Sequence, residues 1–177
     1  AKELVDASDA AFVHAYDDPD IIAGQGTLGL EMLEQVPDVD TVFVPIGGGG
    51  LISGIATAIK HDRPETRVVG VQAAGASTVH ESLQKGIPVT LESVSTIADG
   101  IATGGISEAT LAIIDEHVDT VVTVTDTEIA DAIVLLMERA KQVVEGAGAA
   151  GVAAMLAGGV DVSGETVMPL LCGGNLD

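Results

Sequence analysis

The sequence contains few residues of several types, and each shortage excludes a class of structure. Cys172 is the single cysteine, so no disulfide can form within the chain, and a reducing cytoplasm is the expected location. No run approaches the roughly 18 apolar residues that a membrane-spanning helix needs, so we expect no membrane partner. The first ten residues, AKELVDASDA, lack the apolar core of a signal peptide. Aromatic residues make up only 2% of the chain, so its core must be built from Val, Ile, Leu and Ala.

Basic residues are also scarce. The chain has 27 Asp and Glu residues against 7 Lys and Arg, which gives a formal net charge of −20. Such a chain repels nucleic acid and anionic membrane surfaces, so we expect neither as a partner. A solvated acidic surface that maintains solubility is one explanation of the excess. A second is adaptation to a salt-rich cytoplasm, in which screening weakens the self-repulsion. Full stability in salt-free buffer would contradict this second hypothesis.

What the sequence does contain is an alternation of β-rich runs and helical periodicity. Apolar residues are 47% of the 177, enough to bury a sizeable core. The β-rich runs predict strands at residues 11–14, 41–46, 67–73, 120–124 and 167–171. Helical spacing predicts helices at 26–35, 51–60, 79–85, 107–116, 125–143 and 145–156. Because the strands are apolar throughout, we predict a single α/β domain over residues 1–177, with an open, mostly parallel sheet covered by helices on both faces.

Four successive glycines, Gly47 to Gly50, follow one predicted strand and precede a predicted helix. Unshielded backbone N–H groups at the positive end of a helix dipole form an anion site, most naturally for phosphate. A Walker loop is excluded because Leu51 and Ile52 stand where Lys and Ser or Thr would be required. The dinucleotide pattern G-x-G-x-x-G finds no register either. The alternative is that the glycines only make a tight turn.

Five segments in order give the chain a resemblance to a known family. They are IIAGQGTLGLE (21–31), PIGGGGLISGIA (45–56), TIADGIA (96–102), VVEGAGAAGVAA (143–154) and LCGGN (171–175). Together they resemble the threonine dehydratase and serine racemase branch of the fold-type II pyridoxal-phosphate (PLP) enzymes, the tryptophan synthase β family. The resemblance covers the C-terminal part of the catalytic region in that family.

The resemblance implies a role for each matching residue. The cofactor phosphate would be bound by the main-chain N–H groups of Gly47, Gly48, Gly49, Gly50 and Leu51. Cys172 would face the pyridine nitrogen and leave it largely unprotonated, which suits β-elimination; the alternative is a buried core thiol. Glu145 would lie near the pyridine edge, or else be a helix-terminal charge. Gly100, with Asp99, would line the site, and Asn175 would support the Cys172 loop.

The same comparison predicts no metal site. Serine racemase-like members bind a divalent cation through carboxylates just after the strand at 67–73, where this chain has Gln72 and Thr78. Hard cations need several oxygen ligands, so we expect none to bind there. The four histidines (14, 61, 80 and 117) lack the spacing of zinc ligands.

The catalytic lysine of the family is missing from this chain. In the family, a Lys within an S-x-K-x-R-G-A-like motif carries the cofactor as a Schiff base. The lysines here are Lys2, Lys60, Lys85 and Lys141, and none has that context. We therefore expect the chain to be most of the large PLP-binding domain, inactive alone, with the lysine segment and the small domain absent.

The resemblance implies an activity for the parent protein. It would convert L-threonine to 2-oxobutanoate and ammonia by α,β-elimination, accept serine as a second substrate, and form a homo-oligomer. Three alternatives remain open: a serine racemase or cysteine synthase-like enzyme, a non-catalytic domain that binds another phosphorylated ligand, or a catalytically inactive homologue.

Overall fold

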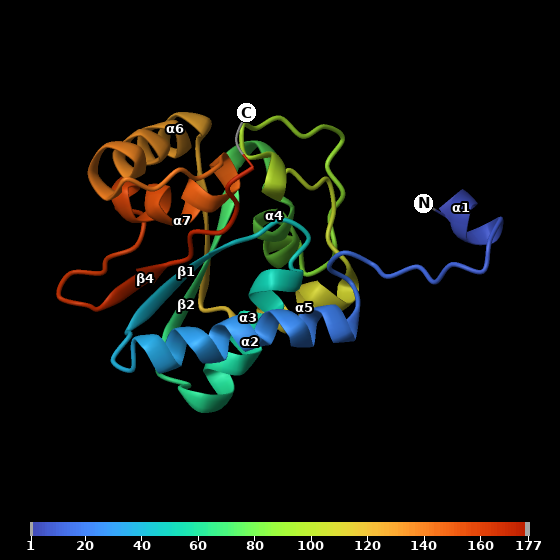
Figure 1. Cartoon of the computed structure of the whole chain (residues 1–177), viewed down its shortest axis with the longest axis horizontal. Helices are drawn as coiled ribbons and strands as arrows, with labels where there is room; N and C mark the ends of the chain where they lie inside the picture. Colours follow the sequence, from blue (N-terminus) through green and yellow to red (C-terminus); the bar gives the residue numbers. More distant parts are fainter. Residues whose placement is uncertain (1, 176–177) are drawn as a thin grey trace.

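The centre of the fold is the strand Thr41–Pro45 (β1), in which every residue is buried. The computed structural model describes residues 2–175, and Figure 1 shows β1 among three other strands. These are Arg67–Ala73 (β2), Thr120–Val124 (β3) and Val167–Pro169 (β4). The sheet order is β3-β2-β1-β4, and all three pairings are parallel. The predicted fold class, a parallel sheet with helices on both faces, is confirmed.

Seven α-helices connect the strands or extend from them. They are Lys2–Asp6 (α1), Pro19–Gln35 (α2), Gly50–Asp62 (α3), Thr78–Lys85 (α4), Glu108–His117 (α5), Asp126–Leu135 (α6) and Gly146–Ala157 (α7). Two 3-10 turns, Ala74–Ala76 (η1) and Asp99–Ile101 (η2), and one π-helical turn, Leu136–Ala140 (η3), complete the secondary structure. No helix within residues 2–175 has the length and apolar character needed to cross a bilayer.

Alternate residues of β1 face two separate hydrophobic clusters. Val42 and Val44 pack with residues of α2, α3 and α5, while Phe43 packs with α6 and α7. This is the two-residue period of a strand buried on both faces. In Figure 1, α2, α3 and α5 lie on one side of the strands and α6 and α7 on the other.

The helix α2 begins seven residues earlier than predicted. Asp18 is its N-cap, and its carboxylate accepts hydrogen bonds from the N–H groups of Asp20 (2.9 Å) and Ile21 (3.3 Å). Pro19 occupies the first helical position, where its missing N–H costs nothing. The sequence DDPD is therefore a helix start and not the turn that we predicted.

The predicted strand at 11–14 was wrong. Phe12 and Val13 are 49% and 62% exposed, and the segment forms no strand. Figure 1 shows why: the chain between α1 and α2 runs outside the body of the molecule, where no strand edge is available for pairing. The sheet consequently has four strands among the described residues and not five.

Two predicted boundaries also shifted. The helix that starts at Asp126 ends with the π-helical turn at Ala140 and does not reach Val143, because Lys141 adopts a left-handed conformation with φ of 60°. The strand predicted at 167–171 ends at Pro169.

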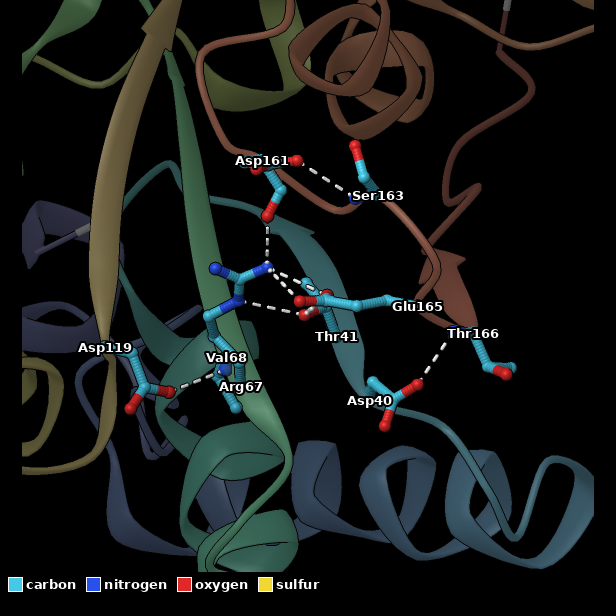
Figure 2. Close-up of polar contacts among 9 residues, drawn as sticks. All are labelled: Asp40, Thr41, Arg67, Val68, Asp119, Asp161, Ser163, Glu165 and Thr166. Atoms are coloured by element: carbon cyan, nitrogen blue, oxygen red, sulfur yellow. Dashed lines mark hydrogen bonds and ion pairs between the residues drawn. The ribbon is translucent and has the colours of Figure 1, made fainter.

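A polar network joins the amino ends of β1 and β2 to the chain before β4 (Figure 2). Arg67 donates to the carboxylate of Glu165 (2.8 and 3.0 Å) and to Thr41 Oγ1 (2.9 Å). Asp40 accepts from the N–H of Thr166 (2.8 Å), and Asp119 accepts from the N–H of Val68 (2.7 Å). This network holds the sheet at the edge opposite the carboxyl end of β1.

Candidate functional site

The glycine loop lies at the carboxyl end of β1, where ligands bind in open α/β sheets. Gly49 is the N-cap of α3 and has a φ of +93°, a left-handed conformation that glycine adopts without strain. The first N–H groups of α3 have no acceptor within the helix, so they point into the space in front of the loop. This geometry is that of an anion site built from backbone dipoles.

A cavity of about 230 Å³ opens in front of the loop. All eight residues that we proposed from the sequence line it: Gly47, Gly48, Gly49, Gly50, Leu51, Gly100, Glu145 and Cys172. The sequence did not single out five more lining residues: Pro45, Ile52, Ile101, Ala147 and Gly173. Asp99 does not line the cavity, and its side chain is exposed. The structure thus brings four separate chain segments to one cavity.

Glu145 connects two of those segments. It precedes α7, and its carboxylate accepts a hydrogen bond from the N–H of Asn175 (3.0 Å), while its own N–H donates to the carbonyl of Gly173 (3.2 Å). The turn after Cys172 is therefore fastened to the start of α7. Asn175 contributes here through its backbone, which supports its predicted bracing of the Cys172 loop.

The Glu145 carboxylate is packed between two glycines. A side chain on Gly100 would begin 2.9 Å from its Oε1, and a side chain on Gly173 would overlap it. Gly173 also has a φ of +95°. Both glycines are thus required for the carboxylate to reach its position, and the same position keeps it at the cavity wall.

The Cys172 thiol favours its neutral form. Burial raises its pKa, and the negative charge of Glu145 contributes to the rise. At neutral pH the cavity therefore presents an uncharged thiol, a weak donor and acceptor.

Tyr16 is a residue that the sequence analysis missed. A side chain on Gly48 would overlap its ring, and a side chain on Gly50 would begin 2.8 Å from its Cα and Cβ. Tyr16 is half-buried against the glycine loop. It is the sole tyrosine of the chain, a signal that could have directed attention to it.

Gln72 is fully buried beside the start of α4. Its amide donates to the carbonyl of Ala76 (3.2 Å) and to Thr78 Oγ1 (3.3 Å), and its Oε1 accepts from the N–H groups of Val79 (3.0 Å) and His80 (2.9 Å). The amide thus fills the place in which the resemblance would put a metal-binding carboxylate. Within residues 2–175, no three His, Cys, Asp or Glu side chains are grouped to hold a metal ion.

Three lysines have partners elsewhere. Lys60 forms an ion pair with Asp119 (2.8 Å), Lys85 pairs with Glu81 (3.3 Å), and Lys141 donates to the carbonyl of Glu138 (2.6 Å). None of the three lines the cavity. The side chain of Lys2 lies outside the described part of the chain.

A larger hollow of about 670 Å³ lies between α2, α3 and α5. Its lining is mostly apolar and includes none of the eight predicted residues. The smaller cavity is the candidate site because backbone donors, a carboxylate and a thiol converge on it.

Comparison with known families agrees with this geometry. Residues 1–173 match the family described as "Pyridoxal-phosphate dependent enzyme". The chain belongs to this family. The predicted family and its cofactor, pyridoxal phosphate, are confirmed.

Relatives narrow the comparison within the PLP enzymes. The chain is 48% identical to the L-threonine ammonia-lyase of Thermotoga maritima over 177 residues, which are 100% of this chain and 44% of that protein. Among solved structures it is similar to a threonine deaminase from the organism abbreviated "T.th." (TM-score 0.94, 41% identity, 99% of this chain and 64% of that one). It is equally similar in fold to maize serine racemase (TM-score 0.95, 38% identity, 99% and 55%). The chain spans less than two thirds of each.

Proposed function

We propose that this chain is the phosphate- and ring-binding part of a PLP-dependent threonine and serine dehydratase. The observation that carries the proposal is the single cavity, in which the glycine loop, Gly100, Glu145 and Cys172 meet. The 48% identity to an L-threonine ammonia-lyase supports elimination as the reaction type.

The residues present fit PLP in three respects. The N–H groups of the loop and of the first turn of α3 would bind the phosphate without a basic side chain. The neutral Cys172 thiol would face the ring nitrogen without protonating it fully, and Glu145 would hold the Cys172 turn in place. PLP, when bound, supplies the electron sink for elimination, while the protein supplies orientation and electrostatics.

The lysine that carries PLP would come from elsewhere in a longer polypeptide. We propose that residues 1–177 form most of the large domain of that protein, and that a lysine segment and a small domain complete it. The chain's coverage of 44% of a full-length relative leaves room for both. In the whole protein, we expect a cytoplasmic homo-oligomer that acts on L-threonine and L-serine and needs no metal.

The test is a product assay on the full-length protein. Purified protein with PLP should release 2-oxobutanoate and ammonia from L-threonine, and pyruvate and ammonia from L-serine. Absence of 2-oxo acid from both substrates, in a preparation that does bind PLP, would contradict the dehydratase proposal.

Serine racemase is the second candidate, because the fold match to maize serine racemase is as close as the match to threonine deaminase. Formation of D-serine in excess of pyruvate from L-serine would favour it. A non-catalytic phosphate-binding domain is distinguished by competition, since simple nucleotides or sugar phosphates would then displace PLP readily.

A further inference from the structure

The glycine loop has a neighbour that does not belong to the cavity. The Tyr16 ring occupies the volume that a side chain on Gly48 would need, and its backbone lies against Gly50. Tyr16 is not among the residues that line the cavity. It therefore supports the loop without occupying the space in front of it.

Tyr16 is held by contacts of the segment 14–18, here called the strap. His14 Nδ1 accepts hydrogen bonds from the N–H groups of Asp17 (2.9 Å) and Tyr16 (3.4 Å). The His14 and Tyr16 rings meet edge to face, with centroids 4.6 Å apart. At its end, Asp18 caps α2, so the strap leads directly into a rigid element.

A second attachment ties the strap to α5. Ser107 Oγ donates to Asp17 Oδ1 (2.7 Å), and Ser107 is also the N-cap of α5. On the same helix, Thr110 lies against the loop, since a side chain on Gly49 would begin 3.0 Å from its Cβ. The loop is therefore contacted by the strap at Gly48 and Gly50 and by α5 at Gly49, and the two contacts are hydrogen-bonded to each other.

We propose that Tyr16 is a positioning residue that fixes the phosphate-binding conformation of the glycine loop. Four consecutive glycines have more backbone freedom than any other sequence, and a loop that is ordered only on binding loses affinity. The ring of Tyr16 removes that freedom before the ligand arrives. This inference rests on the proposed function, because it assumes that the loop binds the phosphate of PLP.

The test uses the full-length protein with PLP removed, titrated with PLP and separately with inorganic phosphate. Tyr16→Ala should weaken the binding of both ligands by about tenfold or more, since the loop must then be ordered by the ligand. Tyr16→Phe should bind within about twofold of the wild type, because the packing ring remains. Phe12→Ala, which removes an exposed aromatic ring from the same stretch of chain, is the matched control and should change nothing.

A double-mutant cycle separates positioning from general stability. Gly48→Ala alone should abolish binding, because the new methyl group enters the volume of the Tyr16 ring. In the Tyr16→Ala background the same substitution should cost much less, so the two effects should be strongly non-additive. Thermal unfolding of each variant, measured alongside, identifies any loss of folded protein.

The outcomes lead to different conclusions. Equal affinity of wild type and Tyr16→Ala for both ligands would overturn the positioning role while leaving the proposed function intact. Additive effects of the two substitutions would overturn it as well. If the wild type binds neither PLP nor phosphate, the proposed function fails, and this inference falls with it.

Discussion

Glycines at the cavity are fixed by two different constraints. Gly49 is required by its backbone, which has a φ of +93°. Gly100 and Gly173 are required by their neighbour, the Glu145 carboxylate. The distinction determines what a substitution should do, because strain in the backbone and loss of space for a neighbouring carboxylate affect different measurements.

Gly49→Ala should both destabilise the protein and impair PLP binding. The left-handed conformation costs a residue with a side chain about 1–2 kcal/mol, and the new methyl group would lie 3.0 Å from Thr110 Cβ. Urea unfolding and a PLP titration measure the two effects. Gly86→Ala is the matched control, because Gly86 has a φ of +68° and open space around it. That variant should lose about 1 kcal/mol and bind PLP normally; a PLP defect in it equal to that of Gly49→Ala would contradict the argument.

Cys172 should react slowly with iodoacetamide near neutral pH. Because burial raises the pKa of its thiol, the folded state favours the protonated form, and the thiolate is the reactive species. The rate should be well below that of the urea-unfolded chain at pH 8 and should rise with pH. By linkage, the stability contributed by the neutral thiol is present below the ordinary pKa of about 8.5 and is lost as pH rises toward the folded pKa. A native rate equal to the unfolded rate at pH 8 would show that the pKa is not raised.

The sequence allowed all eight cavity residues to be predicted, because each lies in a motif with a fixed place in the family. It did not reveal Tyr16, since the contact between Tyr16 and Gly48 joins residues 32 positions apart and leaves no local pattern. The role of Glu145 was also incomplete: its bond to the N–H of Asn175 depends on a backbone position that no motif specifies.

Close packing of α2 against α3 depends on glycines at their crossing. A side chain on Gly54 of α3 would overlap the carbonyl of Ile22 and lie 2.6 Å from the N atom of Gly26 on α2. A side chain on Gly29 would approach the backbone of Ile55 to 2.9 Å. Since α3 carries the glycine loop at its amino end, this crossing sets the position of the site.

Gly54→Ala should destabilise the protein strongly. Separating the two backbones to admit a methyl group should cost about 1–3 kcal/mol or more. Gly24→Ala, also within α2 but with nothing near it, should be neutral or stabilising by up to about 1 kcal/mol, because Ala favours helix over Gly. Thermal and urea unfolding of the pair make the comparison. A similar stability of the two variants would mean that the helices adjust their crossing freely.

Thr125→Ala should cost about 1 kcal/mol of stability through loss of the capping box at α6. Hydrogen bonds from the Thr125 N–H (2.7 Å) and hydroxyl (2.8 Å) lower the pKa of Glu128. That contribution is present above the ordinary pKa of about 4.3 and is lost as pH falls through the folded value. Thr125→Ser should retain most of it, and urea unfolding at pH 7 and pH 3 measures both. A loss on Thr125→Ala that is as large at pH 3 as at pH 7 would exclude the Glu128 contribution.

Elements were predictable where local and tertiary signals agreed. The capping box at Thr125, the helix end at Gly86 and the strand at Arg67–Ala73 were all found from sequence. The run at 11–14 has an apolar composition suited to a strand, but pairing requires an available sheet edge, which composition does not describe. The start of α2 was missed because a Pro after an Asp is compatible with both a turn and a helix N-terminus.

At the scale of the whole molecule, the few basic residues are concentrated at the amino edge of the sheet. Arg67 and Lys60 pair with Glu165 and Asp119 there, which leaves most of the acidic side chains without a partner of opposite sign. Net charge and its repulsion are therefore distributed over the surface, whereas attraction is local. The sequence showed the imbalance but not where the cations would be used.

Salt should stabilise the protein. Raising KCl to about 1 M shortens the Debye length to about 3 Å, which screens surface repulsion more than the close contacts of Arg67. We expect the Tm to rise with KCl, and to rise less in a variant with several exposed acidic residues replaced by Gln or Asn. A Tm that is unchanged or lower in KCl would contradict the salt-adaptation hypothesis.

The way the glycine loop would hold phosphate has a chemical consequence. A reactive aldehyde condenses with any accessible primary amine, so a lysine-based phosphate clamp beside it would invite side products. Here Lys60, Lys85 and Lys141 are each engaged away from the cavity, and backbone amides do not form such adducts. An aldehyde lodged against the loop would therefore meet no competing nucleophilic nitrogen from these side chains, and its selectivity would be set by which amine the rest of the protein delivers.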